Sequence, residues 1–428
     1  MKNYTYKNYA SIIQFGVAKS GIVLLLLTGF FLSSCGERNV QEEIEDRPTV
    51  VVLSLDGFRW DYAEHAHTPN LDKMAKNGVV AQSFIPVFPS GTFANHYGMA
   101  TGLYADNHGI VANRFSCPIL EEDYNKGDRS TVRDGRFYGG EPIWVTAQNQ
   151  GLRTAAFYWV GSEADVMGVR PDRWKVYSNR FPYGDRIDTI ASWLSLPEPK
   201  RPHLIMWYYH QIDSDGHRHG PLADSLLMTV EMKDSLIGVF FEKIENVPNR
   251  ENINFMVVSD HGMAELSPDE RIIRLDNHID RRWIEIYDGG TTTAHIKATE
   301  GKKDTLYEAL KKIPNMSVWK RGEMPERFKF GNHPRVHDMI ILADPGWIMG
   351  RGNRTYTFKG AHGYDNLHPD MHGIFYAMGP DFPKGKTVPS FLNINLFPIM
   401  GELLQIELPE HDAEADIFSR LFSEQDQP

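Results

Sequence analysis

Cysteine is scarce in this chain, and its scarcity excludes several kinds of site. The 428 residues contain only 2 cysteines, Cys35 and Cys117. Multi-cysteine metal centres are therefore excluded, and any metal must be held by Asp, Glu, His or hydroxyl groups. If Cys35 is modified, as argued below, Cys117 has no partner, and no intramolecular disulfide is expected.

An excess of positive charge is also lacking. Lys and Arg number 45 against 56 Asp and Glu, so the formal net charge is -11. Because the sequence has no basic stripe, a nucleic-acid-binding protein is not expected. An anionic substrate must be recruited locally instead, and bound metal cations would do this because they are often the largest local charges in a site.

Long apolar runs are confined to the N-terminus. The run Ile22–Leu32 follows several lysines and is too short to span a bilayer, which takes about 20 apolar residues. It is typical of a signal-peptide core. The sequence Leu32-Ser33-Ser34-Cys35 resembles a bacterial lipobox, which implies that Cys35 is lipidated. A plain secretory signal or a short membrane anchor is the alternative.

These features predict an exported bacterial lipoprotein anchored to the outer membrane through acyl chains on Cys35. Residues 1–34 are interpreted as the signal peptide and residues 35–47 as a flexible tether. The pattern leaves open whether the protein faces the periplasm or the cell surface. A monomer is expected.

Apolar strands alternate with helical segments from residue 48 onward, which predicts an α/β fold: a central, mostly parallel sheet with helices on both faces. The expected strands are Thr49–Leu55, His203–Tyr209, Asn252–Val258 and Gly373–Met378, and the expected helices are 68–76, Thr92–Thr101, Pro221–Ile244 and Asn393–Leu404. The mixed stretch 264–355, with short strands at Thr292–Ile296 and Met339–Leu342, is interpreted as an inserted α+β subdomain. The catalytic core is then 48–263 and 356–410, and 411–428 is a C-terminal tail.

Asp and His residues gather where the predicted strands end. Asp56 and the pair Asp260-His261 directly follow strands, and a polar loop holding Asp213 and His217 follows another. In parallel sheets, function collects beyond the carboxyl ends of the strands. With His362 these residues provide enough donors for two divalent ions such as zinc.

Thr92 is the candidate nucleophile. The glycine before it allows a tight turn, and Thr92 then begins a helix, where free N–H groups favour an anion. A zinc-bound hydroxyl ionises easily and becomes a usable nucleophile. The competing interpretation is that Thr92 is only a helix cap.

Together these segments resemble the ectonucleotide pyrophosphatase/phosphodiesterase family of the alkaline-phosphatase superfamily. The matching segments are Leu53-Ser-Leu-Asp56-Gly-Phe-Arg, Thr92 through Asn95-His96-Tyr97, Thr101-Gly-Leu-Tyr, His108-Gly-Ile-Val-Ala-Asn113, Asp213-Ser-Asp-Gly-His217, Ser259-Asp260-His261-Gly262-Met263 and His362-Gly-Tyr-Asp365-Asn366.

The resemblance implies two zinc ions and a role for each matching residue. One zinc would be held by Asp56, Thr92, Asp260 and His261, and the other by Asp213, His217 and His362. Thr92 would attack phosphorus and form a phosphothreonine that water then hydrolyses. Asn113 would donate to a phosphate oxygen. His96, His108, His219 and His372 are interpreted as structural.

The resemblance also implies a nucleobase pocket. Phe93 and Tyr177 would sandwich a base, with Trp159 in the same segment, because base stacking on an aromatic ring contributes about 1–3 kcal/mol. Val160 and Glu163 depart from the family pattern, so the pocket is expected to differ in shape. That Phe93 and Tyr177 merely fill the core is the competing interpretation.

The leading hypothesis is therefore zinc-dependent hydrolysis of nucleotide pyrophosphates or phosphodiesters, releasing nucleoside monophosphates. The neutral side chain of Asn113 suits a diester better than a doubly charged monoester. Cleavage of phospholipid headgroups or phosphonates is an alternative, in which Tyr158 and Trp159 would contact a choline cation. A surface-anchored lipoprotein that binds ligands without catalysis is an alternative of another class.

Overall fold

The computed structural model describes residues 47–267 and 269–423. The predicted signal peptide and Cys35, the predicted site of lipidation, lie outside this range. Within the described residues, no helix combines the length and the apolar character that crossing a membrane requires.

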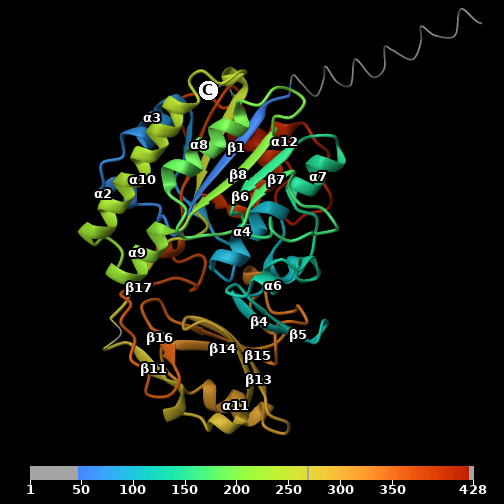
Figure 1. The fold of residues 1–428 in the computed structure, drawn as a ribbon. Helices are drawn as coiled ribbons and strands as arrows, with labels where there is room; N and C mark the ends of the chain where they lie inside the picture. Colours follow the sequence, from blue (N-terminus) through green and yellow to red (C-terminus); the bar gives the residue numbers. More distant parts are fainter. Residues whose placement is uncertain (1–46, 268, 424–428) are drawn as a thin grey trace, which may run out of the picture. The chain divides into compact units, whose positions relative to one another are not determined.

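An eight-stranded sheet forms the centre of the fold, and it is mostly parallel, as predicted (Figure 1). In spatial order its strands are β19 (Lys386–Val388), β2 (Val79–Ala81), β18 (Phe375–Met378), β9 (Ile253–Val258), β1 (Thr49–Leu55), β8 (Leu204–Tyr209), β6 (Thr154–Phe157) and β7 (Arg173–Lys175). Only β18 runs antiparallel to its neighbours β2 and β9. The three central strands are buried along their whole length, because runs such as Thr49–Leu55 offer apolar side chains to both faces.

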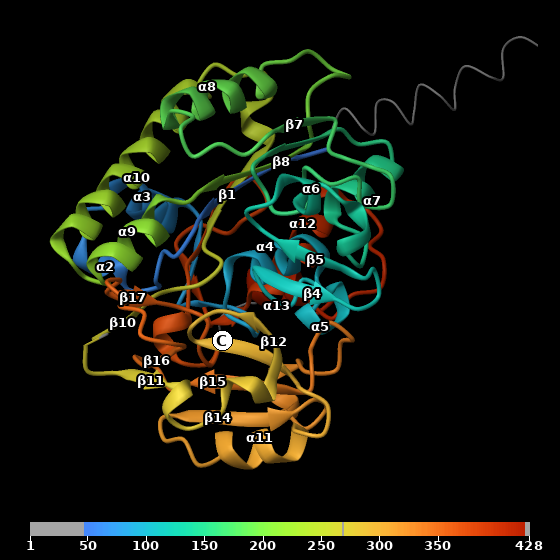
Figure 2. The ribbon, with the colours of Figure 1, turned by 60° about the horizontal axis from the view of Figure 1, so that its bottom comes forward.

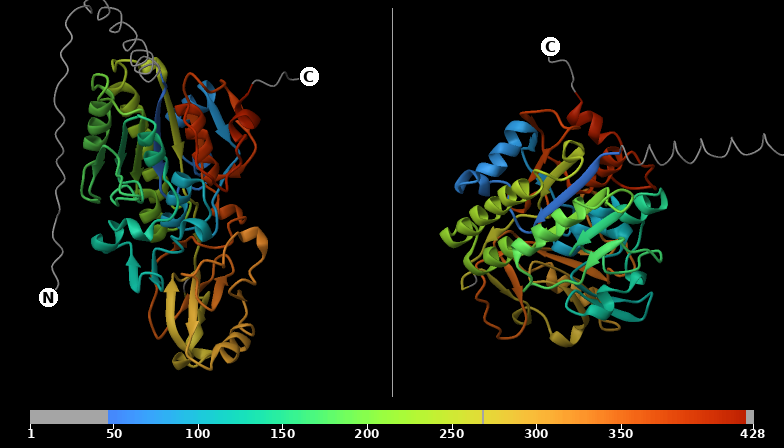
Figure 3. Two further views of the ribbon diagram at one scale, coloured as in Figure 1. Left: turned by 90° about the vertical axis from the view of Figure 1, so that its right-hand side faces the viewer. Right: turned by 45° about the horizontal axis from the view of Figure 1, so that its top comes forward.

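Helices cover both faces of this sheet, as the sequence predicted (Figure 3). One face carries α3 (Pro69–Asn77), α8 (Tyr183–Leu194) and α10 (Asp224–Lys243), whose apolar side chains share a core with β1, β8 and β9. The other face carries α4 (Thr92–Thr101), α7 (Ile143–Asn149) and α12 (Leu396–Leu404). The buried central strands are therefore shielded from water on both sides.

The stretch expected to be inserted contains a separate antiparallel sheet of four strands (Figure 2). Its strands are β12 (Ile284–Gly289), β13 (Thr293–Ala298), β15 (Met339–Ala343) and β14 (Met316–Lys320), with α11 (Lys303–Leu310) packed against it. A two-stranded ribbon pairs Ala264 with Ala361, which brings the two ends of this stretch side by side. The chain can therefore leave the large sheet, build the smaller one and return at the same place.

One predicted element is wrong. The residues after β8 form a helix, α9 (Gln211–His219), instead of a polar loop. Its Ser-Asp-Gly sequence has low helix propensity, which is why the sequence indicated a loop. Tertiary contacts override that propensity, because α9 packs on α10 and Asp215 accepts a hydrogen bond from Thr229 of α10 at 2.7 Å.

The C-terminal stretch also contains a helix, α13 (Ile417–Phe422), whose apolar side chains are buried. Phe422 stacks on Phe375 of β18 with 6.0 Å between ring centroids. The segment predicted as a tail thus includes a helix that is packed against the large sheet.

Candidate active site

Two adjacent strand ends of the large sheet bring one group of predicted ligands together. Asp56 follows β1, and Asp260 and His261 follow the adjacent strand β9. His261 Nε2 lies 3.4 Å from Asp56 Oδ1 and 3.2 Å from Asp260 Oδ2. We call these three residues the first cluster, and all three are buried.

A second cluster consists of Asp213, His217 and His362. Because α9 is helical, Asp213 and His217 lie one turn apart, and their Oδ1 and Nε2 atoms are 3.3 Å apart. His362 follows β17 (Gly360–Ala361) and places Nε2 3.5 Å from the same Asp213 oxygen. The His261 and His362 rings stack with centroids 3.6 Å apart, so the two clusters adjoin.

A close backbone approach holds the two clusters together. Gly57 has φ +72°, and a Cβ atom there would lie 2.8 Å from Asp213 Cα. Only glycine suits both this conformation and this contact. The Gly57 N–H donates to Asp260 Oδ1 at 3.2 Å, and the Tyr208 hydroxyl donates to Asp56 Oδ2.

One carboxylate oxygen of each aspartate in the two clusters accepts no hydrogen bond. Asp56 Oδ1, Asp213 Oδ1 and Asp260 Oδ2 are buried and accept no hydrogen bond. Burying such a charged atom without a partner costs several kcal/mol of folding free energy. A cation bound beside each of these oxygens would offset that cost. In the absence of one, burial and the neighbouring carboxylates Asp260 and Asp213 raise the pKa of Asp56 well above its ordinary value. Burial likewise raises the pKa of Asp260 to about 8.

The three histidines present the atom that a metal needs. In each ring, Nδ1 lies 2.7–2.8 Å from a backbone carbonyl: Gly360 for His217, Gly262 for His261 and Ser90 for His362. A ring that donates from Nδ1 keeps its Nε2 lone pair for a metal. Burial lowers the pKa of His362 to about 4, which keeps that ring neutral. Although burial opposes it, the Asp213 carboxylate raises the pKa of His217 to about 9, so a proton there takes the place of a cation.

The chemistry of this donor set fits divalent metals. Oxygen and nitrogen ligands about 2.1 Å from a tetrahedral ion are separated from one another by roughly 3.4 Å. The spacings of 3.2–3.5 Å within both clusters agree with that value.

Thr92 begins α4 beside the first cluster. Its Oγ1 lies 3.2 Å from His261 Nε2. The capping position of α4 belongs to Gly91, and the Thr92 side chain does not cap this helix. The interpretation of Thr92 as a helix cap is therefore wrong, and its hydroxyl faces the predicted ligands instead.

Asn113 is held at the same helix start. Its Oδ1 accepts from the Phe93 N–H at 3.3 Å, which leaves its amide N–H groups available to an oxygen of a substrate. The backbone N–H groups at the beginning of α4 add positive potential at this point.

A cavity of about 570 Å³ opens beside Thr92 and Asp56, and we call it the Tyr177 cavity. Phe93 and Tyr177 both line it, and Tyr177 remains 38% exposed although it is a large aromatic residue. Glu163 accepts from the Tyr177 N–H at 2.9 Å and is paired with Arg129, which fixes this segment. Both rings are thus accessible at the cavity wall.

Trp159 is placed differently from the other predicted pocket residues. It belongs to the wall of the Tyr177 cavity, but it is only 2% exposed, and its indole N–H donates to the carbonyl of His96 at 2.9 Å. Most of its surface packs inside the fold, including an edge contact with the His96 ring. Trp159 therefore packs behind the cavity wall and has little ring surface available to a ligand.

Of the histidines interpreted as structural, His96 borders the first cluster, with its Nδ1 3.3 Å from Asp260 Oδ2. His96 and His108 are buried and contact the carbonyls of Thr92 and Ala94, and His372 contacts the hydroxyl of Ser83. His219 is exposed at the end of α9.

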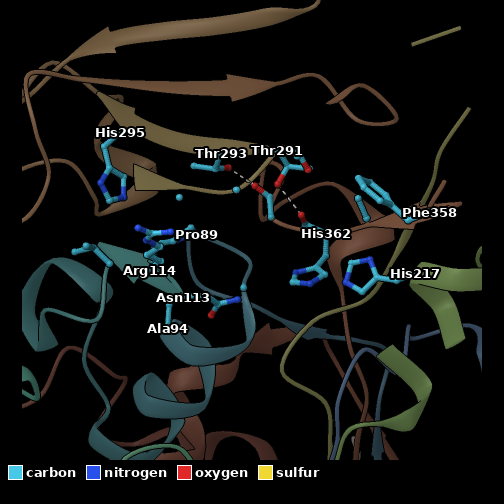
Figure 4. Close-up of a pocket in the computed structure, with 18 of the residues that line it drawn as sticks. Pro89, Ala94, Asn113, Arg114, His217, Thr291, Thr293, His295, Phe358 and His362 are labelled. Atoms are coloured by element: carbon cyan, nitrogen blue, oxygen red, sulfur yellow. Dashed lines mark hydrogen bonds between the residues drawn. The ribbon is translucent and has the colours of Figure 1, made fainter. Parts of the chain in front are cut away.

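A second cavity, of about 450 Å³, lies between α4 and the smaller sheet, and we call it the Arg354 cavity (Figure 4). His217 and His362 stand together at one end of it and His295 at the other, with Asn113 in the wall. Two arginines in the wall of the Arg354 cavity, Arg114 and Arg354, were not predicted from the sequence as functional residues. The only sequence feature that could have indicated Arg114 is its position directly after Asn113. Arg354 lies in a segment without a motif.

Comparison with known proteins gives consistent results. A family model described as type I phosphodiesterase / nucleotide pyrophosphatase matches residues 50–365. Ectonucleotide pyrophosphatase/phosphodiesterase family member 5 from Homo sapiens is 33% identical over 389 residues, covering 90% of this chain and 80% of that protein. Family member 1 from Rattus norvegicus is 31% identical over 396 residues, but this chain spans only 43% of its length.

Solved structures agree as well. The murine family member 5 superimposes with a TM-score of 0.84 at 32% identity, covering 88% of this chain and 100% of that chain. A second structure of that murine protein is of an inactive threonine-to-alanine variant in complex with AMP, and it has the same TM-score of 0.84.

Proposed function

This chain belongs to the type I phosphodiesterase / nucleotide pyrophosphatase family, and we propose that it cleaves nucleotide pyrophosphate or phosphodiester bonds through Thr92. It is a phosphoric diester hydrolase like the relatives it matches, so the alternative of a non-catalytic binding lipoprotein is set aside. The observation that carries the proposal is the position of the Thr92 hydroxyl, 3.2 Å from His261 and beside two clusters of unpaired carboxylate oxygens.

Two zinc ions are proposed as the cofactors. The first cluster, with Thr92, would hold one ion, and the second cluster would hold the other. When bound, the ions lower the pKa of a coordinated hydroxyl or water and offset negative charge on the reacting phosphate.

The residues of the chain have separate roles in the proposed reaction. Thr92 Oγ1 gives its proton to solvent water and forms a bond to phosphorus, while the bond from phosphorus to the leaving oxygen breaks and its electron pair departs with the leaving group. The Asn113 amide and the N-terminal N–H groups of α4 donate to the non-bridging oxygens as charge accumulates on them. Water then cleaves the phosphothreonine, which regenerates the hydroxyl and releases a nucleoside monophosphate.

The Tyr177 cavity is proposed to hold the nucleoside. Phe93 follows the nucleophile directly, and Tyr177 lines the same cavity, so a base between these rings would keep its phosphate near Thr92. The AMP bound by the murine relative supports a nucleoside monophosphate as the retained half. A choline cage of Tyr158 and Trp159 is less well supported, because Trp159 is buried.

The Thr92→Ala variant tests this proposal. With the thymidine monophosphate ester of para-nitrophenol as substrate, we expect kcat to fall at least about 1000-fold while the bound zinc remains. Thr189→Ala, at a half-buried position of α8 outside both clusters and both cavities, is the matched control and retains wild-type kcat. Turnover retained by Thr92→Ala, or no turnover by the zinc-loaded wild type, contradicts the proposal.

A further inference from the structure

The two cavities are lined by different members of the candidate metal clusters. The Tyr177 cavity includes Asp56, Asp213 and Thr92, and the Arg354 cavity includes His217 and His362. A substrate whose reacting phosphorus lies at Thr92 can therefore extend into both. If the nucleoside occupies the Tyr177 cavity, the departing half of the substrate faces the Arg354 cavity.

The two cavities differ in charge. The Tyr177 cavity carries both signs, since Asp56, Asp213, Asp215 and Glu163 share its wall with Lys126, Arg129 and Arg218. The wall of the Arg354 cavity contains Arg114 and Arg354 but neither Asp nor Glu. In a chain of net charge -11, a cavity with arginines and no carboxylates is a local exception that favours an anion.

Both guanidinium groups are free to bind. Across residues 47–267 and 269–423, neither Arg114 nor Arg354 forms an ion pair, whereas many other arginines do. Arg354 lies over the Tyr356 ring, with its guanidinium carbon 5.6 Å from the centroid, and this contact holds the side chain at the cavity wall. Arg114 begins β4 (Arg114–Cys117) directly after Asn113, the residue proposed to contact the reacting phosphate.

We propose that the Arg354 cavity is the subsite for the leaving group, in which Arg114 and Arg354 bind a phosphate beyond the scissile phosphorus. The proposal rests on the function proposed above and sharpens its substrate class. A planar guanidinium presents several N–H donors to phosphate oxygens, a geometry that an uncharged leaving group does not use. The subsite therefore favours pyrophosphate-linked nucleotides over diesters whose leaving group carries no phosphate.

The test compares two substrates in the zinc-loaded full chain. One is ATP, whose leaving group is pyrophosphate, and the other is the para-nitrophenyl ester of thymidine monophosphate. The measured quantity is the ratio of kcat/KM for ATP to kcat/KM for the ester. In the double variant Arg114→Gln/Arg354→Gln we expect this ratio to fall about tenfold or more, because charge-assisted hydrogen bonds to one substrate only are lost.

Arg281→Gln is the matched control and leaves the ratio unchanged. Arg281 is an exposed arginine before the edge strand β12, and it forms no ion pair with any residue that the structure describes. A ratio within twofold of wild type in the double variant overturns the subsite, and so does an equal loss on both substrates. Wild-type protein that cleaves neither substrate refutes the proposed function itself, so the two failures are distinguishable.

Discussion

Two regions of this molecule contain clusters of Asp and His that look alike at first sight. One region is the edge of the large sheet, with the first and second clusters. The other is the smaller sheet, where Asp288, His295 and His337 are all buried and also place their ligand atoms within 4.8 Å of one another. The distances between carboxylate oxygens and histidine nitrogens distinguish the two regions.

At the large sheet, carboxylate oxygens and histidine nitrogens are 3.2–3.5 Å apart, and three of the oxygens accept no hydrogen bond. In the smaller sheet, Asp288 Oδ2 lies 2.7 Å from His337 Nε2 and also accepts from the Ser116 N–H at 2.6 Å. The first spacing suits two ligands of one ion, and the second suits a shared proton. Although His295 Nδ1 is also buried without a hydrogen-bond partner, only the clusters at the large sheet combine unpaired carboxylate oxygens with ligand spacing, and this combination is what favours a metal.

Replacing one carboxylate in each region gives the largest expected difference. Asp260→Asn removes a candidate zinc ligand, so we expect kcat on the thymidine ester to fall at least about 1000-fold and one zinc per chain to be lost. Asp288→Asn is the matched change in the other region and should keep both the zinc content and kcat. Elemental analysis of purified protein, together with initial rates, measures both quantities. Loss of zinc from Asp288→Asn would mean that the cluster in the smaller sheet also binds zinc.

Stability should depend on zinc through one region only. An ion that binds the native state alone, at 100 times its dissociation constant, raises the free energy of unfolding by about 3 kcal/mol. We expect this gain in wild type and in His337→Asn, measured by urea unfolding with and without zinc. In His362→Asn the gain should be clearly smaller, because the second cluster has lost a ligand. An equal zinc effect in both variants would mean that the two regions bind zinc alike.

The sequence predicted that Asp56, Asp260 and His261 lie close together because they stand at strand ends, and their role as metal ligands stays a prediction. Asp56 and Asp260-His261 directly follow the buried runs that become β1 and β9, and parallel strands align such ends at one edge. His362 lies about 100 residues beyond His261, and only the family resemblance linked it to the site. Its place depends on the ribbon that pairs Ala264 with Ala361, which no local pattern reveals.

Other features depend on long-range contacts that carry no sequence signal. Asp288 and His295 face each other because β12 and β13 pair in that register, and His337 joins them from the segment before β15. Tyr208, which donates to Asp56, is hidden in an apolar run that indicates only a buried strand. Arg354 and Asn113 line the same cavity between α4 and the smaller sheet, so their proximity appears only once both parts are folded.

The smallest expected effect is the response of the smaller sheet to pH. Burial, followed by the proximity of His337, lowers the pKa of His295 to about 4, below its ordinary value of 6.5. The unfolded chain therefore binds a proton at higher pH than the folded chain, and stability falls as the pH drops from about 6.5 towards 4. Relative to pH 7.5, we expect His295 to cost about 1 kcal/mol of unfolding free energy at pH 5.5. Urea unfolding at both pH values measures this cost as the difference between wild type and His295→Gln. A variant whose stability changes with pH as much as that of wild type would show that His295 does not titrate in this way.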